Sequence, residues 1–400
     1  MTSDAPRSYV LTGAPVILPH EIVHGTDVLV EADSIRAVGA GIDMPSAVPR
    51  VRAPGSWIAP GFVDIHTHGA LGASFLEATD DAFEVILREQ ARHGVTTLLP
   101  TTSTAPFDAI LDTLRTTQRW MQHDHALPEI PGAHVEGPYF ASTQVGAQDP
   151  SNLRTPDDGS VERLMEHANA IRIVSYAPEL PGSIELTNTL VRQGIIAAAG
   201  HSEARDRDLQ ACTTWGLSHA IHLWSAQSTT WREGPHRQPG LLEASLASSH
   251  LTGEVIGDGK HLPPTLLRLA HAALGPDRLC VVSDATSGAG LSEGDTFTMG
   301  EMSYVVSEGV GMMLDRSSFA GSTTLLGGMI AILASTGIPL VDVVRMASTT
   351  PARVIGLDRS LGSIRPGLQA DFAILDDHLR PVQTIKRGVP IWTHGKESSS

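Results

Sequence analysis

The residues with the clearest chemical meaning in this 400-residue chain are two histidines at the end of an apolar run. His66 and His68 follow residues 58–65, which are rich in apolar and β-branched side chains. Residues two apart in a strand point to the same face, so both imidazoles would enter the same space. A single histidine there is most often a core residue with satisfied hydrogen bonds. Two at this spacing favour a metal site, because histidine is the commonest metal ligand.

Other apolar runs also end in side chains that can bind a metal or move a proton. These side chains are Glu136, His201, His222 and Asp284, at the ends of residues 133–136, 195–201, 220–223 and 279–283. Nitrogen and oxygen donors of this kind suit one or two divalent cations of the Zn or Fe class. Their recurrence on successive runs is hard to explain by packing alone, so we expect one shared site.

Two further histidines in these runs are expected to have roles other than metal binding. His134 lies two residues before Glu136 and therefore faces the same side, where we expect it to support the ligands by hydrogen bonding. His219 lies three residues before His222, so it would point to the opposite face and serve the structure.

The scarcity of lysine excludes several chemistries. The chain has three lysines, Lys260, Lys386 and Lys396, and none before residue 260. A carboxylated lysine therefore cannot bridge two metals on the early strands, and Glu136 would have to bridge instead. A Schiff-base lysine on those strands is excluded for the same reason. The sequence also lacks a G-x-S-x-G elbow and a phosphate-binding G-x-x-x-x-G-K-[ST] loop.

The elements that would position these residues alternate in type along the chain. Between residues 56 and 365, eight short apolar runs are each followed by a helix-length amphipathic stretch. Continuous apolar strands alternating with helices predict a parallel sheet covered on both faces, and eight units close a (β/α)8 TIM-like barrel. A doubly wound open sheet is the alternative architecture. Polar residues at the carboxyl ends of the strands favour the barrel, since barrel enzymes place their chemistry there.

The two ends of the chain read differently. Residues 1–55 and 366–395 hold short β-branched runs separated by turn residues, and neither end carries enough apolar residues for its own core. We expect them to pair into one small β-sandwich domain beside the catalytic barrel of residues 56–365. Residues 396–400 are expected to form a disordered tail.

Composition narrows the possible partners. The formal net charge of −16 argues against a nucleic acid, which needs a basic surface. No run reaches the roughly 18 apolar residues that a membrane helix requires. Two cysteines, Cys212 and Cys280, exclude a disulfide framework and favour a reducing compartment, so we expect a cytoplasmic protein.

Several motifs together resemble the amidohydrolase superfamily, and within it the N-acetylglucosamine-6-phosphate deacetylases. The resemblance spans nearly the whole chain. It rests on the segments 59–69 (APGFVDIHTHG), 132–139 (GAHVEGPY), 199–202 (AGHS), 258–261 (DGKH), 284–286 (DAT), 319–322 (FAGS), 346–353 (MASTTPAR) and 367–372 (GLQADF). The resemblance also implies the composite terminal β domain typical of that superfamily.

The resemblance implies a role for each matching residue. His66, His68, Glu136, His201 and His222 correspond to ligands of one or two divalent metals (Zn, Fe, Mn or Co), and Asp284 corresponds to the general acid/base. The substrate-binding positions would be Ala147, Gln148, Ser225, Ala226, Arg237, His261, Phe319, Ala320 and Gly321. Arg237 matches an arginine that reaches the sugar phosphate of a neighbouring subunit, which implies a homodimer. The alternative for Arg237 is a solvated loop cation.

Two positions depart from the family pattern. Gln148 stands where the family has a histidine that polarises the acetyl carbonyl, and Ser225 stands where it has an asparagine. Residues 228–235 also form a longer loop than is usual in the family. The expected metal ligands are all present, so the departures concern the substrate side of the site.

These observations favour a metal-dependent amide hydrolase that removes the N-acetyl group from an amino sugar phosphate, releasing acetate and the free amine. One alternative is a related enzyme that acts on a non-phosphorylated N-acyl amino sugar or another amide. A metal-binding scaffold without catalytic activity is a further alternative, which the intact ligand set and Asp284 oppose.

Overall fold

The computed structural model describes residues 8–42, 47–122 and 126–396 as a mixed α/β fold. The predicted disordered tail at 396–400 lies, apart from Lys396, outside the described residues. Among the described residues, every helix is too short or too polar to span a lipid bilayer. Both described cysteines are buried and carry free thiols.

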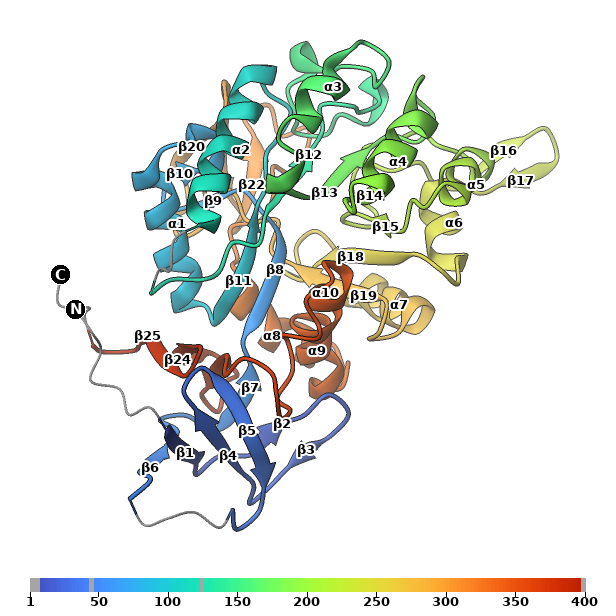
Figure 1. Ribbon diagram of the computed structural model, residues 1–400. Helices are drawn as coiled ribbons and strands as arrows, with labels where there is room; N and C mark the ends of the chain where they lie inside the picture. The colour runs from blue at the N-terminus through green and yellow to red at the C-terminus, as the bar shows by residue number, and fades with distance from the viewer. Residues whose placement is uncertain (1–7, 43–46, 123–125, 397–400) are drawn as a thin grey trace.

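Parallel strands form the centre of the fold, as the apolar runs predict (Figure 1). One parallel pair joins β8 (Phe62–Thr67) and β11 (Val95–Pro100). A six-stranded parallel sheet follows in the order β12 (Ala133–Glu136), β13 (Ile171–Tyr176), β14 (Ile196–Ala199), β15 (His219–Ala220), β18 (Thr252–Ile256) and β19 (Leu279–Val282). Isolated parallel bridges, Thr101 to His134 and Thr67 to Ala285, join the pair to both edges of this sheet.

Helices lie around the outside of these strands (Figure 1). Their buried residues recur at helical spacing, so each buries one apolar face against the strands. In α1, for example, Phe83, Ile86 and Leu87 are buried. The α-helices are α1 (Asp80–Arg92), α2 (Phe107–Met121), α3 (Ser160–Met165), α4 (Ser183–Arg192), α5 (Asp206–Thr214), α6 (Leu241–Ala247), α7 (Pro264–Leu274), α8 (Leu326–Ser335), α9 (Leu340–Met346) and α10 (Thr349–Val354).

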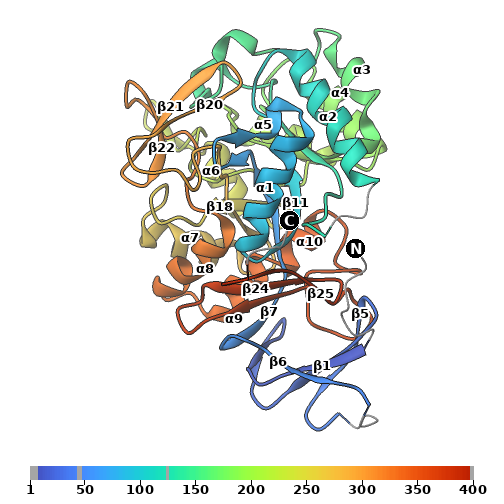
Figure 2. The ribbon, with the colours of Figure 1, turned by 90° about the vertical axis from the view of Figure 1, so that its left-hand side faces the viewer.

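Strands from the two ends of the chain lie together at one end of the molecule (Figure 2). One sheet has the order β25 (Val389–Thr393), β24 (Pro381–Lys386), β23 (Phe372–Leu375), β7 (Trp57–Pro60), β2 (Val16–Ile17) and β3 (Ile22–Val23). The other has the order β5 (Ser34–Gly39), β4 (Asp27–Glu31), β1 (Ser8–Thr12) and β6 (Arg50–Arg52). The buried Tyr9 hydroxyl donates to the Gly388 carbonyl (3.0 Å), which ties the N-terminal strands to the C-terminal ones.

Two insertions between the parallel strands were not predicted. A hairpin of β16 (Trp231–Glu233) and β17 (His236–Gln238) projects from the body of the molecule (Figure 1). A three-stranded antiparallel sheet of β20 (Thr296–Met299), β21 (Met302–Ser307) and β22 (Val310–Met313) follows β19. The loop after β22 carries Phe319, which lines the cavity described below.

The shared terminal core gives a first stability prediction. Phe372 is fully buried among residues of both chain ends, including Leu11 and Val28. We expect Phe372→Ala to lower the free energy of unfolding by about 3–5 kcal/mol, because the truncation loses apolar contact and leaves a cavity. Urea denaturation measures the change. The half-exposed Leu269 supplies the control, since Leu269→Ala should change stability by less than about 0.5 kcal/mol. Equal effects of the two substitutions would contradict a core shared by the chain ends.

Candidate metal centre and active site

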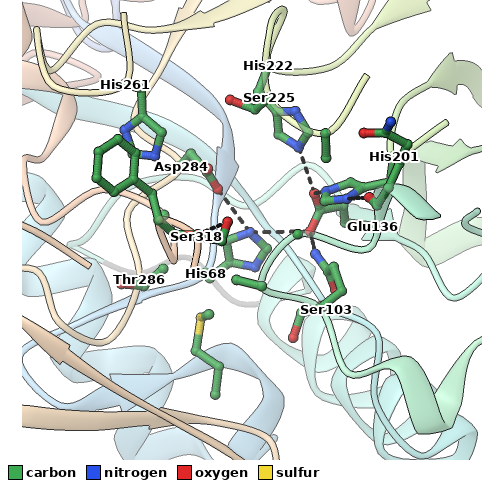
Figure 3. Close-up of a pocket in the computed structure, with 18 of the residues that line it drawn as sticks. His68, Ser103, Glu136, His201, His222, Ser225, His261, Asp284, Thr286 and Ser318 are labelled. Atoms are coloured by element: carbon green, nitrogen blue, oxygen red, sulfur yellow. Dashed lines mark hydrogen bonds and ion pairs between the residues drawn. The ribbon is translucent and has the colours of Figure 1, made fainter. Parts of the chain in front are cut away.

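The side chains singled out at the strand ends converge on one cavity of about 540 Å³ (Figure 3). His68, Glu136, His201, His222 and Asp284 line this cavity, and each lies at or just beyond the carboxyl end of a parallel strand. His66 is fully buried beside them. The parallel arrangement explains the convergence, since it brings the carboxyl ends of separate strands to the same edge.

One half of the cluster is built on the strand β8 and on Asp284. The Nε2 atoms of His66 and His68 lie 3.6 and 3.2 Å from Asp284 Oδ1. Asp284 is buried, and burial would raise the pKa of its carboxyl group, but the hydrogen bond from His68 and the nearby imidazoles hold that pKa below its usual value. The carboxyl group is therefore ionised at neutral pH.

The other half of the cluster surrounds Glu136. Its Oε1 atom lies 3.0 Å from Nε2 of His222, 3.2 Å from Nε2 of His201 and 3.5 Å from Nε2 of His66. Burial raises the pKa of Glu136, but the three imidazoles outweigh this effect and hold the pKa well below the usual range. The Oε1 atom of Glu136 thus lies close to His66 from the first half of the cluster and to His201 and His222 from the second.

The donor set fits a divalent cation. The ligand atoms of His66, His68 and Asp284 lie within 4.8 Å of one another, as do those of His66, Glu136 and His222. Among the described residues, Nε2 of His66 is buried without a hydrogen-bond partner, an arrangement that costs free energy unless a ligand occupies it. Imidazole and carboxylate donors are typical of Zn and related cations.

The backbone at this site is strained at two of these residues. His201 and Asp284 both have φ of +45°, in the left-handed region that residues other than glycine rarely adopt. Such conformations cost roughly 1–3 kcal/mol each and cluster at functional sites. At Asp284, hydrogen bonds from its own N–H to the His66 carbonyl (2.9 Å) and from the Ser322 N–H to its carbonyl (2.8 Å) hold the conformation.

Buried polar groups lie behind the cluster. His134 is hydrogen-bonded through Nδ1 to the Ile65 carbonyl (3.0 Å) and through Nε2 to the Ser175 hydroxyl (2.8 Å). Burial and the nearby His66 lower the pKa of His134 to about 3, so its ring is neutral. Sequence reasoning did not identify Glu254, which accepts hydrogen bonds from His66 and His219. The signal was present, since Glu254 is the one acid in the apolar run 251–257.

Most of the expected substrate-binding residues lie on the same cavity. Its lining includes Ala147, Gln148, Ser225, Ala226, His261, Phe319 and Gly321. Ala320 is buried beneath the lining, and Arg237 is exposed on β17 and outside the cavity of its own chain. The His261 ring is held by Asp258, which accepts from its Nδ1 at 2.8 Å, so a ligand would meet Nε2.

Gln148 is held in one orientation by two partners. Its Nε2 donates to Oε2 of Glu136, and its Oε1 accepts from the Thr104 N–H at 2.6 Å. The amide cannot be reversed, because a carbonyl oxygen has no hydrogen to offer to a carboxylate. Gln148 therefore touches both the expected metal ligand and the space for substrate.

Comparison with known proteins defines the class. The model of the Amidohydrolase family matches residues 57–395, and the chain belongs to this family. It is accordingly a hydrolytic enzyme, as the strand-end motifs predicted.

Particular relatives narrow the comparison. The N-acetylglucosamine-6-phosphate deacetylase of Vibrio furnissii is 31% identical over 333 residues, covering 83% of this chain and 82% of that protein. The N-acetylgalactosamine-6-phosphate deacetylase of Escherichia coli O157:H7 is 28% identical, covering 86% and 88% of the two chains. A mutant N-acetyl-D-glucosamine-6-phosphate deacetylase from Mycobacterium smegmatis, solved in complex with N-acetyl-D-glucosamine-6-phosphate, superposes with a TM-score of 0.89 at 30% identity, over 97% of this chain and 100% of the other.

Proposed function

We propose that this chain removes the N-acetyl group from an amino sugar 6-phosphate by metal-dependent hydrolysis, releasing acetate and the free amine. The observation that carries the proposal is the ionised Asp284 carboxylate beside a buried cluster of histidines and Glu136 on the wall of an open cavity. The similarity to deacetylases of N-acetylated amino sugar phosphates supports the substrate class.

The proposed architecture is a (β/α)8 barrel of residues 56–365 with a β-sandwich domain from residues 1–55 and 366–395. The two bridges that join the parallel pair to both edges of the six-stranded sheet support closure of the barrel. The two sheets of terminal strands share one apolar core, which supports the composite domain.

His66, His68, Glu136, His201 and His222 would hold one or two divalent cations of Zn, Fe, Mn or Co. Such a cation supplies Lewis acidity, which polarises an amide carbonyl and makes water a stronger acid. Glu136 would connect two positions, since its Oε1 faces His201 and His222 while its Oε2 lies 3.6 Å from His68.

Asp284 would move the proton. Its carboxylate accepts a proton from the water that attacks the acetyl carbonyl carbon, and it then gives this proton to the sugar nitrogen as the C–N bond breaks. The second transfer is essential, because an amine anion is too basic to leave. Gln148 would assist by hydrogen bonding, since one hydrogen of its amide nitrogen is used by Glu136 and the other remains for the carbonyl oxygen.

Among the described residues that line the cavity there is no lysine or arginine for the phosphate, and His261 would be its contact within the chain. Arg237 lies on the exposed hairpin, directly opposite Arg232 across the strands. We propose a homodimer in which this hairpin brings Arg237 to the cavity of the partner copy. The missing cation equally favours the second candidate function, hydrolysis of a non-phosphorylated N-acyl amino sugar.

A substrate comparison separates these functions. We expect kcat/KM for N-acetylglucosamine 6-phosphate to exceed that for N-acetylglucosamine by about 100-fold or more, because charge-assisted hydrogen bonds to a phosphate are worth several kcal/mol together. Initial rates of acetate release with both compounds measure the ratio. Equal rates would support the non-phosphorylated substrate, and stoichiometric metal binding without any hydrolysis would support the silent scaffold.

The arginine contribution is tested in the same assay. Arg237→Ala should lower kcat/KM for the phosphorylated compound by about 10–100-fold and leave that for the non-phosphorylated compound unchanged. Arg232→Ala is the matched control, since it removes the same charge from the opposite strand of the hairpin.

A further inference from the structure

A buried acid that does not face the cavity connects several parts of the metal centre. Glu254 lies on β18 with no exposed surface. Its Oε2 accepts from Nδ1 of His66 at 2.9 Å and from the backbone N–H of His222 at 3.2 Å. One carboxylate oxygen therefore holds both a ligand side chain on β8 and the backbone of a second ligand after β15.

The other oxygen of Glu254 is held by a histidine. His219 donates from Nε2 to Oε1 at 3.0 Å, and its Nδ1 lies 2.7 Å from the Thr252 hydroxyl. His219 is the register partner of Thr252 in the parallel sheet. Thr252 and Glu254 are two residues apart and share a face, so the His219 ring lies between them. An imidazole that donates from Nε2 has its lone pair on Nδ1, so the Thr252 hydroxyl, which also lies 3.1 Å from the Ser218 carbonyl, can donate to Nδ1 of His219.

These contacts determine which nitrogen of His66 is free. A carboxylate can only accept, so Nδ1 of His66 carries a hydrogen, and Nε2 is left as the nitrogen that can bind a cation. That Nε2 is one of several buried nitrogens without a hydrogen-bond partner among the described residues, and it faces Glu136 and Asp284. Outer hydrogen bonds of this kind fix the tautomer and the angle of a ligating imidazole.

We propose that Glu254 and His219 form a positioning pair that aims Nε2 of His66 at a divalent cation. Both oxygens of Glu254 accept hydrogen bonds from His66, His222 and His219, so the pair would act on the cation through the ligands that it holds. The inference rests on the proposed metal-dependent function. Its test uses metal binding in the absence of substrate, so a wrong substrate assignment would leave the result intact.

The test is titration of the metal-free full-length protein with Co²⁺, followed by visible absorption and by calorimetry. Glu254→Gln keeps the size of the side chain but removes its charge, and it should weaken Co²⁺ binding by about 10–100-fold and change the absorption spectrum. His219→Gln should weaken binding in the same direction by a smaller factor, since it leaves Glu254 in place. Restoring the acid as Glu254→Asp should recover part of the affinity.

The control variant breaks a similar carboxylate–histidine pair outside the metal centre. Glu89 on α1 is also a carboxylate beside a histidine, with its Oε1 3.4 Å from Nε2 of His93. Glu89→Gln should leave the affinity and spectrum for Co²⁺ unchanged. Circular dichroism identifies any variant that has not folded, and His219→Gln then carries the test alone. Wild-type affinity and spectrum in a folded Glu254→Gln or His219→Gln protein would overturn the proposal.

Discussion

Asp284→Asn is expected to lower kcat by about 10³-fold or more while metal content stays unchanged. Asparagine has nearly the same shape and keeps an oxygen toward His66 and His68, but it can neither accept nor deliver the proton. General acid–base catalysis contributes about 10²–10⁴-fold, and Asp284 would serve in both proton transfers. Initial rates on N-acetylglucosamine 6-phosphate and elemental analysis of the purified protein measure the two quantities.

The control for this variant is a carboxylate–imidazole pair outside the cavity. Asp342 accepts from Nε2 of His271 at 2.9 Å, so Asp342→Asn makes the same chemical change without touching the site. It should leave kcat within about twofold. Normal turnover by Asp284→Asn would show that another group moves the proton. Loss of metal in parallel with loss of activity would show that Asp284 acts mainly as a ligand.

The candidate ligands could be predicted because their signal is local. His66 and His68 alternate on one strand, and Glu136 and Asp284 each follow an apolar run. When parallel strands are connected by helices, the carboxyl ends of all the strands lie at the same edge of the sheet. Residues at the ends of separate apolar runs are therefore expected to lie close together, although they are far apart in the sequence. The structure brings all six expected ligand and proton-transfer residues together, with neighbouring ligand atoms 3.0–3.6 Å apart.

The parts that could not be predicted depend on contacts between segments. Residues 58–65 read as one strand, yet β7 pairs with β23 and β8 pairs with β11. Gly61 separates them, and a Cβ there would lie 2.2 Å from the Thr96 hydroxyl. The contact with Thr96 on β11 explains why a glycine stands there, and the Pro60–Gly61 pair is the local sign in the sequence that the run divides.

The hydrogen-bond partners of individual side chains could not be predicted from the sequence either. Gln148 was expected to face the substrate, and its amide nitrogen also donates to Glu136. His219 was expected to point away from the face of His222 and to serve the structure, and its partner Glu254 lies behind the cluster. Spacing indicates the face of a strand, but the partner on that face comes from a strand more than 30 residues away.

Glu136→Gln is expected to remove most of the bound metal and to lower kcat/KM by about 10³-fold. Three imidazole nitrogens surround Oε1 of Glu136 within 3.5 Å, so this carboxylate supplies the negative charge for both halves of the cluster. The amide would keep the size of the side chain but present either a neutral oxygen or an N–H group to those nitrogens. Losing several kcal/mol of cation stabilisation corresponds to a rate loss of this order.

Elemental analysis and activity assays, with and without added Zn²⁺, measure both effects. Dialysis of the wild-type protein against a chelator should reproduce the loss, and Zn²⁺ should restore activity to the wild type only. Glu179→Gln is the matched control, because Glu179 accepts from the Ser202 hydroxyl at 2.7 Å next to His201 but lies outside the cavity lining. If Glu136→Gln retained full metal content and activity, the shared oxygen would not be the centre of the site, and a cation bound by His66, His68 and Asp284 alone would explain the enzyme.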